Sequence, residues 1–319
     1  MSFSRIKGQE LPIRIIKNSL KKERLGDAYL FYGPGGVGKK LTALNLAKLV
    51  NCSSGSDEPC DECPSCRRID EDNHPDIHIV VKDEDARDLK IDQIRQLEDN
   101  IYLKPFEGKK KVFIIDGADD MNEQAQNALL KTLEEPPANS ILILLSENIQ
   151  TLLETIHSRC SRLRFNRLSV EHITGILIEQ YGLDQEEALV LARVSEGSLE
   201  KAAELKEYFQ NRRELITKIS KGLANLADDD QWVGLDREEA IDLLKFVSNW
   251  CRDVLLVQSG VDQQSMLINP DYGQELADFS NFYDTDRLLD IMGQIHKTMG
   301  LIKGNVNTKL ALEVLWNNV

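Results

Sequence analysis

The sequence lacks an excess of positive charge. Its 319 residues include 39 Lys and Arg against 53 Asp and Glu, which gives a formal net charge of −14. Proteins that wrap nucleic acid neutralise phosphates with clustered Lys and Arg. The balance therefore argues against a large basic footprint on nucleic acid and leaves room for a few local phosphate contacts. Most of the acidic side chains are expected to form a solvated surface that aids solubility.

Long hydrophobic runs are also missing. The aliphatic stretches are as short as Ile141 to Leu145, far below the roughly 20 residues that a membrane-spanning helix needs. The polar segment from Met1 to Leu11 has no apolar core of a secretory signal. These features predict a cytoplasmic protein without membrane association, whose thiols are kept reduced.

Cysteines are few, but four of the six are clustered as C-x7-C-x2-C-x2-C. In a reducing compartment such a cluster indicates a metal site, because two-residue gaps let thiolates turn onto one tetrahedral ion. From Asn51 to Asp72 the only clearly apolar residue besides cysteine is Ile69, so the segment has little to bury. Binding of Zn²⁺ can contribute about 10–16 kcal/mol to the free energy of folding of such a segment. We predict a closed structural zinc site; the alternative is a flexible loop with unrelated thiols. The expected ligands are Cys52, Cys60, Cys63 and Cys66.

Strand and helix patterns alternate in the first half of the chain, which indicates a parallel sheet covered by helices on both faces. After about Asn166 only helical patterns remain. Expected strands are 28–32, 77–81, 112–115, 141–145 and 163–165. Expected helices are 9–22, 41–50, 91–101, 122–135, 149–157, 170–181, 185–195, 199–207, 215–227, 237–258, 285–303 and 308–316. The stretch 260–283 is expected to be loop with short turns.

A glycine-rich segment follows the first expected strand. Residues 33–40 fit the phosphate-loop pattern G-x-x-x-x-G-K-[ST] at every position but the last. The glycines would let backbone N–H groups surround phosphate oxygens, and Lys39 would reach the terminal phosphates. The last position should carry a hydroxyl for Mg²⁺, but Lys40 brings an ammonium with no lone pair for a metal. Two like unit charges ~4 Å apart repel by about 4 kcal/mol near a protein surface. The candidate nucleotide-binding residues are Gly33, Gly35, Gly36, Gly38, Lys39 and Lys40.

A second part of a nucleotide site is also incomplete. An apolar strand ends at Asp116, a carboxylate that helps to hold the metal in phosphate-loop enzymes. Many of these enzymes place a Glu next to polarise water, but Gly117 follows here. Asp120 or Asn122 is expected to cap the helix that begins there. Because two catalytic functions are missing, we expect no hydrolysis in cis; ATP or ADP binding to the backbone of the loop stays open, and Lys40 could itself contact phosphate.

Three further motifs resemble one protein family. The run Asn127-Ala-Leu-Leu-Lys-Thr-Leu-Glu-Glu-Pro-Pro137 matches the signature helix of clamp-loader ATPases of the AAA+ class, and Ser158-Arg159-Cys160 matches their Ser-Arg-Cys motif. Gly8-Gln9 resembles their N-terminal helix entry. With the cysteine cluster, the chain resembles a clamp-loader subunit of bacterial DNA polymerase III. The altered loop and the missing Glu resemble the delta-prime type more than the ATP-hydrolysing tau/gamma type.

The resemblance implies an architecture of three domains. A RecA-like AAA+ domain would span 1–166 with the zinc insertion at about 51–72, a three-helix lid would span 167–209, and an all-α collar would span 210–319. The resemblance is specific to about Glu207 and only architectural beyond. It also implies partners: tau/gamma and delta subunits, with the sliding clamp and primed DNA reached through the complex.

The implied function is that of a non-hydrolysing member of the DNA polymerase III clamp-loader ring, supporting ATP-dependent opening and loading of the sliding clamp in replication. Arg159 would be an arginine finger for a neighbouring ATPase subunit, a role worth ~10³–10⁵ in rate. Without the family match, a surface arginine or a carboxylate partner is the simpler reading. Lys201 stands where active relatives have a nucleotide-sensing arginine, and a point charge replaces a bidentate fork only in part.

Two alternative functions remain open on the sequence. One is a catalytically active AAA+ ATPase of the tau/gamma type, which Lys40 and Gly117 disfavour. The other is a zinc-ribbon module that binds nucleic acid. Seven acidic residues within 57–72 disfavour it, because they would repel phosphates: Asp57, Glu58, Asp61, Glu62, Asp70, Glu71 and Asp72.

Overall fold

The computed structural model describes residues 2–83, 86, 88–219, 222–223, 234–260 and 266–318. It divides into two compact units, Met1–Leu183 with Ser195–Ala203 and Asp184–Val194 with Glu204–Val319. The division into 1–166, 167–209 and 210–319 expected from the sequence stays a prediction. Among the described residues, no helix has both the length and the apolar character that crossing a bilayer requires.

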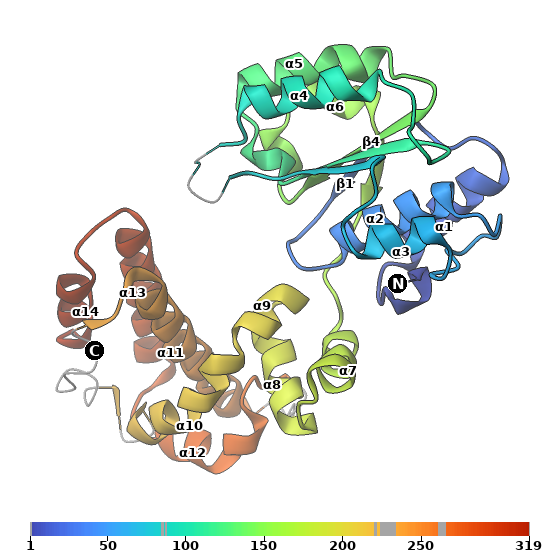
Figure 1. Ribbon diagram of the computed structural model, residues 1–319. Coiled ribbons are helices and arrows are strands. Elements are labelled where there is room, and N and C mark those ends of the chain that lie inside the picture. Colours follow the sequence, from blue (N-terminus) through green and yellow to red (C-terminus); the bar gives the residue numbers. More distant parts are fainter. Residues whose placement is uncertain are drawn as a thin grey trace. The chain divides into compact units, whose positions relative to one another are not determined.

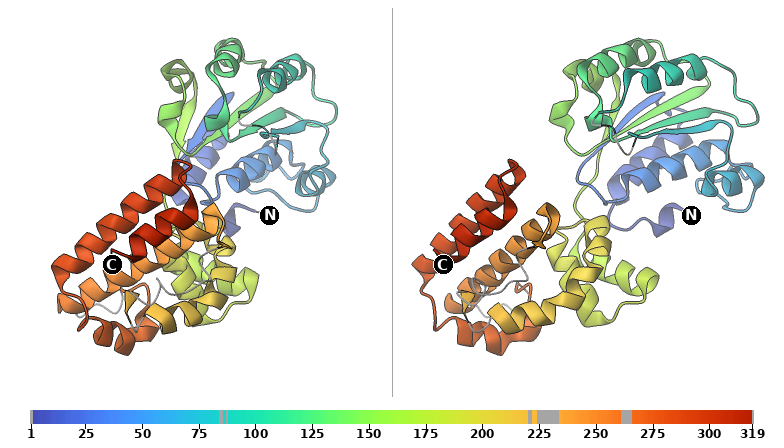
Figure 2. Two further views of the ribbon diagram at one scale, coloured as in Figure 1. Left: turned by 90° about the vertical axis from the view of Figure 1, so that its left-hand side faces the viewer. Right: turned by 60° about the vertical axis from the view of Figure 1, so that its left-hand side comes forward.

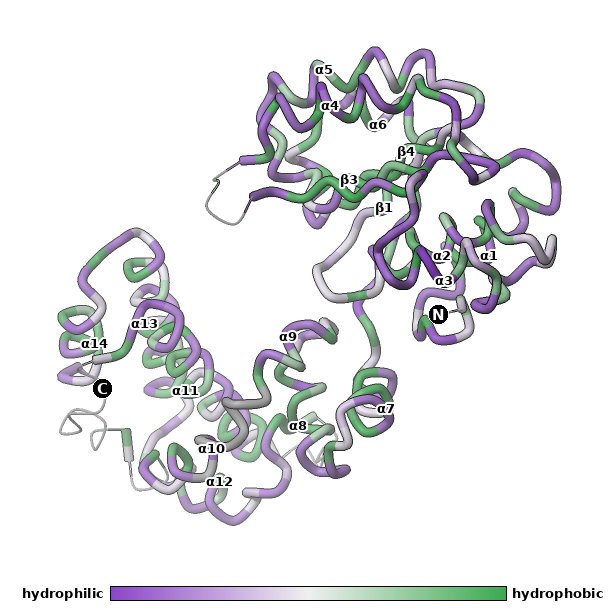
Figure 3. The backbone as a smooth tube through the Cα atoms, viewed as in Figure 1, coloured by the Kyte–Doolittle hydropathy of each residue, from purple (hydrophilic) through white to green (hydrophobic). Residues whose placement is uncertain are grey.

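A five-stranded parallel sheet forms the centre of the first unit (Figure 1). The strand order is β2-β3-β4-β1-β5. The strands β3, β4 and most of β1 are buried and hydrophobic along their length (Figure 3), as expected when helices cover both faces. All five expected strands are confirmed, with ends shifted by up to two residues. They are β1 (Ala28–Tyr32), β2 (Ile77–Val80), β3 (Lys111–Asp116), β4 (Ser140–Ser146) and β5 (Ser161–Arg164).

Two groups of helices cover the sheet (Figures 1 and 2). One face carries α4 (Ile91–Ile101), α5 (Glu123–Glu134) and α6 (Glu154–Arg159), and the other carries α1 (Glu10–Lys21), α2 (Lys39–Asn51) and α3 (Pro64–Asp70). Apolar side chains of α4, α5 and α6 pack on β1, β3 and β4 in one core. The predicted cap is confirmed for Asn122, whose side chain accepts a hydrogen bond from the Ala125 N–H at 2.9 Å.

The helices after β5 belong to both units. In the first unit lie α7 (Val170–Tyr181) and α9 (Leu199–Glu204), and in the second α8 (Gln185–Val194), α10 (Lys206–Ile219), α11 (Arg237–Gln258), α12 (Gly273–Phe279), α13 (Thr285–Lys303) and α14 (Thr308–Trp316). The expected helix 199–207 is divided between α9 and α10. The expected helix 215–227 is met by α10 to Ile219, and most of its remainder lies outside the described residues.

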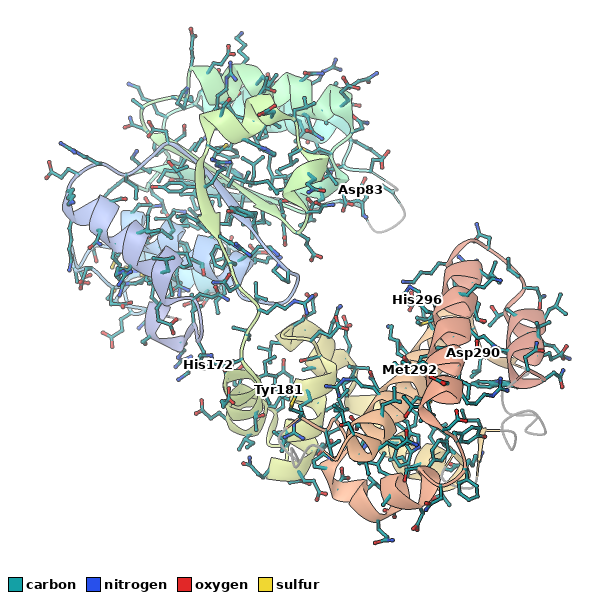
Figure 4. The ribbon with its side chains drawn as sticks, turned by 180° about the vertical axis from the view of Figure 1, so that it is seen from behind. Asp83, His172, Tyr181, Asp290, Met292 and His296 are labelled. Carbon is teal, nitrogen blue, oxygen red and sulfur yellow. The ribbon has the colours of Figure 1, made fainter. Side chains whose placement is uncertain are left out.

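The second unit has its own core around the fully buried Trp250. The loop expected at 260–283 is wrong in part, because α12 forms there. Its Leu276 and Phe279 are both buried, and the Phe279 ring packs on Trp250 edge to face at 6.2 Å. Tertiary packing thus overrides the polar composition of this stretch. In α13, Asp290 and His296 are exposed while Met292 packs against the core (Figure 4).

Candidate functional site

The glycine loop connects β1 to α2, at the carboxyl end of a strand that lies between β4 and β5. In open α/β sheets this is where ligands commonly bind. Gly33, Gly36 and Gly38 have φ values of 145°, 63° and 96°, a region that side chains rarely adopt and glycine tolerates. The local backbone therefore has the conformational freedom that a phosphate loop needs.

Protein atoms crowd the start of this loop. A Cβ on Gly33 would lie 2.1 Å from the carbonyl oxygen of Phe165, which follows β5. A Cβ on Gly35 would lie 2.4 Å from Oε1 of Glu147, the residue that follows β4. A carboxylate thus lies against the loop whose backbone would receive phosphate, and like charges repel.

The segment before α9 packs against the middle of the loop. A Cβ on Gly36 would lie 2.4 Å from Oγ of Ser198 and 2.7 Å from the backbone nitrogen of Glu200. The Leu199 N–H donates to the Gly36 carbonyl at 3.0 Å. Gly36 is therefore required by contacts within the protein, whatever ligand the loop binds.

Lys39 is directed at the loop's own backbone. Its Nζ donates to the carbonyl oxygens of Gly33 at 2.7 Å and Pro34 at 2.6 Å. The residue is 9% exposed. Burial lowers the pKa of Lys39, while the nearby Glu147 carboxylate acts in the opposite direction. The ammonium that would contact terminal phosphates is thus already solvated by carbonyl groups.

Lys40 and Asp116 are brought together. The Lys40 Nζ lies 3.0 Å from Oδ2 of Asp116, the carboxylate at the end of β3. Both residues were singled out in the sequence as positions where a metal would be held. In the structure their charges neutralise each other, because the Lys40 ammonium forms an ion pair with the carboxylate that would help to hold Mg²⁺.

Asp119 connects the ends of two strands. Its Oδ1 accepts hydrogen bonds from Oγ of Ser146 at 2.7 Å, from the Asn148 N–H at 3.1 Å and from Oγ1 of Thr151 at 3.1 Å. The end of β4 is thereby fixed beside the end of β3, and Asp119 has a structural task. Gly117 adopts a φ of 81°, which a Glu at this position would not readily adopt.

The four clustered cysteines converge. The sulfurs of Cys52, Cys60, Cys63 and Cys66 all lie within 4.8 Å of one another. Cys52 and Cys66 are buried, and Cys63 begins α3 by accepting from the Cys66 N–H. Burial would raise the pKa of the Cys63 thiol, but hydrogen bonds from Ser53 and Cys66 lower it to about 6. The four thiol donors and their spacing fit a bound metal ion.

Acidic residues of the insertion attach it to the neighbouring helices. Lys48 of α2 is only 1% exposed and forms ion pairs with Asp61, at 2.9 Å, and with Asp70. Lys21 of α1 pairs with Asp57 at 2.8 Å. Much of the acidity that argues against phosphate binding thus also holds the insertion in place.

Arg159 is the last residue of α6 and lies at the surface of the first unit. Its Nη2 lies 2.6 Å from Oε1 of Glu134, and its Nη1 donates to the Thr155 carbonyl at 3.0 Å. The next residue, Cys160, is buried, and burial raises the pKa of its thiol to about 12. Cys160 is therefore an inert packing residue, while the guanidinium beside it stays partly accessible.

Sequence reasoning missed the residues that fill the loop. Glu147, which follows β4, and Ser198, which precedes α9, are brought to the glycines from distant parts of the chain. The available signal was positional, because Glu147 follows a buried strand whose carboxyl end must lie at the same edge as the loop. No sequence spacing predicts the contact of Ser198 with Gly36.

These features define the class: an α/β protein with a phosphate-type loop at its sheet edge, a four-cysteine insertion and a helical second unit. Residues 8–169 match the family "DNA polymerase III, delta subunit", and residues 206–318 match "DNA polymerase III, delta subunit, C terminal". The chain therefore belongs to the DNA polymerase III delta-subunit family, which confirms the resemblance identified in the sequence.

Individual relatives agree with this family. DNA polymerase III subunit delta′ of Bacillus subtilis is 37% identical over 86% of this chain and 86% of its own length. DNA polymerase III subunit tau of Escherichia coli is 35% identical over 73% of this chain. This chain spans only 37% of that relative's length. A solved gamma subunit-related protein of Thermotoga maritima is 18% identical, with a TM-score of 0.47 and coverage of 96% of this chain and 97% of its own, a likeness too slight to bear on function.

Proposed function

We propose that the chain is a non-hydrolysing subunit of a bacterial clamp loader. In this role it supports the ATP-dependent opening of a sliding clamp and its placement on primed DNA, as part of a DNA polymerase III assembly with tau/gamma and delta subunits. The match to a delta′ relative over 86% of both chains supports this choice over the tau/gamma type.

The observation that carries the proposal is the Lys40–Asp116 ion pair, with its 3.0 Å contact. Hydrolysis in phosphate-loop enzymes depends on a metal held by the loop hydroxyl and the strand carboxylate. Here the loop hydroxyl is replaced by the ammonium of Lys40, and this ammonium pairs with the strand carboxylate of Asp116. The contacts of Glu147 and Ser198 with the loop glycines add to this argument, because phosphate would have to displace them.

Arg159 is proposed to act in the active site of a neighbouring tau/gamma subunit. An arginine that cannot serve its own altered loop can still stabilise charge that develops on a phosphate in the next subunit. The exposure of its side chain, 33%, is compatible with reaching out from the surface. The chain itself would then have no catalytic residue in cis.

The cysteine cluster is proposed to hold a structural Zn²⁺. Four thiolate ligands are typical of closed tetrahedral zinc sites. In this position the ion would order α3 and the turn before it, and would supply no chemistry to a substrate.

The second unit is proposed to serve as the oligomerisation domain. On α14, Leu310 and Val314 are 56% and 55% exposed, one helical turn apart on the same face. Leu301 and Val306, near the end of α13, are also exposed. Exposed apolar residues arranged in this way are typical of a protein interface.

The test is a reconstituted loader that contains this chain with its tau/gamma and delta partners. Arg159→Ala should lower ATP turnover at the site it borders by about 10³-fold, with assembly unchanged. Lys39→Ala, in the altered loop, should leave turnover of the complex unchanged. Magnesium-dependent ATP hydrolysis by the isolated chain, abolished by Lys39→Ala, would instead establish an active ATPase of the tau/gamma type.

A further inference from the structure

Two motifs that are separate in the sequence meet at one edge of the first unit. Glu134 is the last residue of α5, within the Leu-Glu-Glu-Pro-Pro run, and Arg159 is the last residue of α6, within Ser-Arg-Cys. Both helices lie on the same face of the sheet (Figure 1). Their C-terminal ends place a carboxylate directly beside the proposed finger.

The contacts of the guanidinium fix its plane. Glu134 Oε1 lies 2.6 Å from Nη2, while the Thr155 carbonyl accepts from Nη1 at 3.0 Å. Nη1 also donates to Oγ of Ser158 at 3.4 Å. A guanidinium carries five N–H donors in a rigid fork, so Nε–H and one N–H on Nη2 remain for another acceptor. Held in this way, the arginine is oriented and still able to bind a phosphate.

The neighbouring acid, Glu135, makes a useful comparison. It is exposed like Glu134, but it has no ion pair within the part of the chain that the structure describes. The two carboxylates share their charge, their helix end and their proximity to Pro136, and differ in their contact with Arg159.

We propose that Glu134 is a positioning residue that preorganises Arg159 for a phosphate of the neighbouring subunit. This rests on the proposed role of Arg159. A free arginine side chain loses rotamer entropy worth roughly 2 kcal/mol when it is fixed, and a partner that orients it beforehand reduces this loss. Exposed ion pairs are weak, so Glu134 restricts the side chain without holding it away from a stronger acceptor.

The experiment uses the reconstituted complex with steady-state ATP turnover. Glu134→Ala should lower kcat at the bordering site by about 3-fold, the size expected of one exposed ion pair, with KM for ATP unchanged. Glu134→Gln should retain most of the activity, because its amide oxygen still accepts from Nη2. Glu135→Ala is the matched control and should have no effect. In the Arg159→Ala background, Glu134→Ala should cause no further loss.

Each outcome separates the two proposals. No loss with Arg159→Ala would refute the finger role itself. A loss with Arg159→Ala but none with Glu134→Ala would refute only the positioning role. An increase in turnover with Glu134→Ala would mean that the carboxylate masks the arginine. A loss that persists in the Arg159→Ala background would assign Glu134 a task independent of Arg159.

Discussion

The glycine loop and the cysteine cluster both match ligand-binding patterns, yet the structure treats their polar groups in opposite ways. In the loop the groups are satisfied by the protein: Lys39 Nζ donates to two carbonyls and Lys40 pairs with Asp116. In the cluster, four sulfurs converge within 4.8 Å of one another. Four convergent sulfur donors fit a bound metal ion, whereas the polar groups of the loop are paired within the protein.

The difference lies in what each segment would be without a ligand. The loop lies between β1 and α2 and packs against Phe165 and Ser198, so its conformation is fixed by its surroundings. The insertion is polar and has Ile69 as its buried aliphatic side chain. We expect such a segment to depend on the proposed metal for its order, while the loop depends on its neighbours.

Removal of the metal should have the largest effect. Cys66→Ser should abolish stoichiometric zinc binding and expose 52–72 to proteolysis, because a structural zinc supplies about 10–16 kcal/mol. Metal analysis and limited proteolysis check this, with Cys160→Ala as the control that keeps zinc binding and resistance to proteolysis.

For the natural chain, millimolar ATP with Mg²⁺ should not raise the melting temperature. A stabilising shift with ATP would end the contrast between the two motifs.

Gly36→Ala should be the next most damaging change. The φ of 63° costs an L-residue about 1–2 kcal/mol, and the new Cβ would lie 2.4 Å from Ser198 Oγ. We expect a loss of more than about 2 kcal/mol of unfolding free energy in urea titrations. Gly175→Ala in α7 is the control, because the added Cβ would meet no atom of another element within 4 Å. It should raise the free energy of unfolding by up to ~1 kcal/mol. Equal stability of the two variants would mean that the loop is not packed as described.

Asp76 holds the segment that contacts α3 beside the cysteine cluster, and its contribution to stability should depend on pH. Its buried carboxylate accepts from the N–H groups of Phe106 at 2.6 Å, Glu107 at 2.9 Å and Gly108 at 2.7 Å, and Glu107 in turn pairs with Arg68 of α3. Burial alone would raise the pKa of Asp76, but these three donors lower it below its ordinary value.

A lowered folded-state pKa adds stability above the unfolded value near 3.8, and this stability is lost as pH falls through the folded pKa. Asp76→Asn should therefore cost about 1–3 kcal/mol at neutral pH, with a difference that shrinks in acid. Urea titrations from pH 7 to pH 3 check this. A difference that stays constant with pH would mean that the charge of Asp76 contributes nothing.

Much of the fold could be predicted from the sequence, and so could the convergence of the four cysteines. Buried strands such as 141–145 and the spacing of the cysteines carry strong local signals. The contacts that fill the loop could not be predicted, because Glu147 and Ser198 approach Gly35 and Gly36 from other elements. The pairing of Lys40 with Asp116 is also non-local: each residue was identified alone, and only the adjacency of the strand ends unites them. The helix α12 was missed because packing of Phe279 on Trp250 outweighs a polar local composition.

Lys40→Thr has the smallest expected effect, and it tests most directly the contrast between the loop and the cysteine cluster. It restores a hydroxyl that can bind Mg²⁺ and frees Asp116 from its ion pair. We expect binding of ATP with Mg²⁺ to the isolated chain to tighten by about 10-fold, about 1.4 kcal/mol, as measured by calorimetry. We expect no ATP turnover by this variant, because Gly117 supplies no carboxylate to polarise water. Lys40→Arg, which keeps the charge beside Asp116, should bind as weakly as the natural chain. Unchanged affinity in Lys40→Thr would place the obstacle at Glu147, whose carboxylate lies against Gly35, since the hydroxyl and the free Asp116 would then both be present without effect.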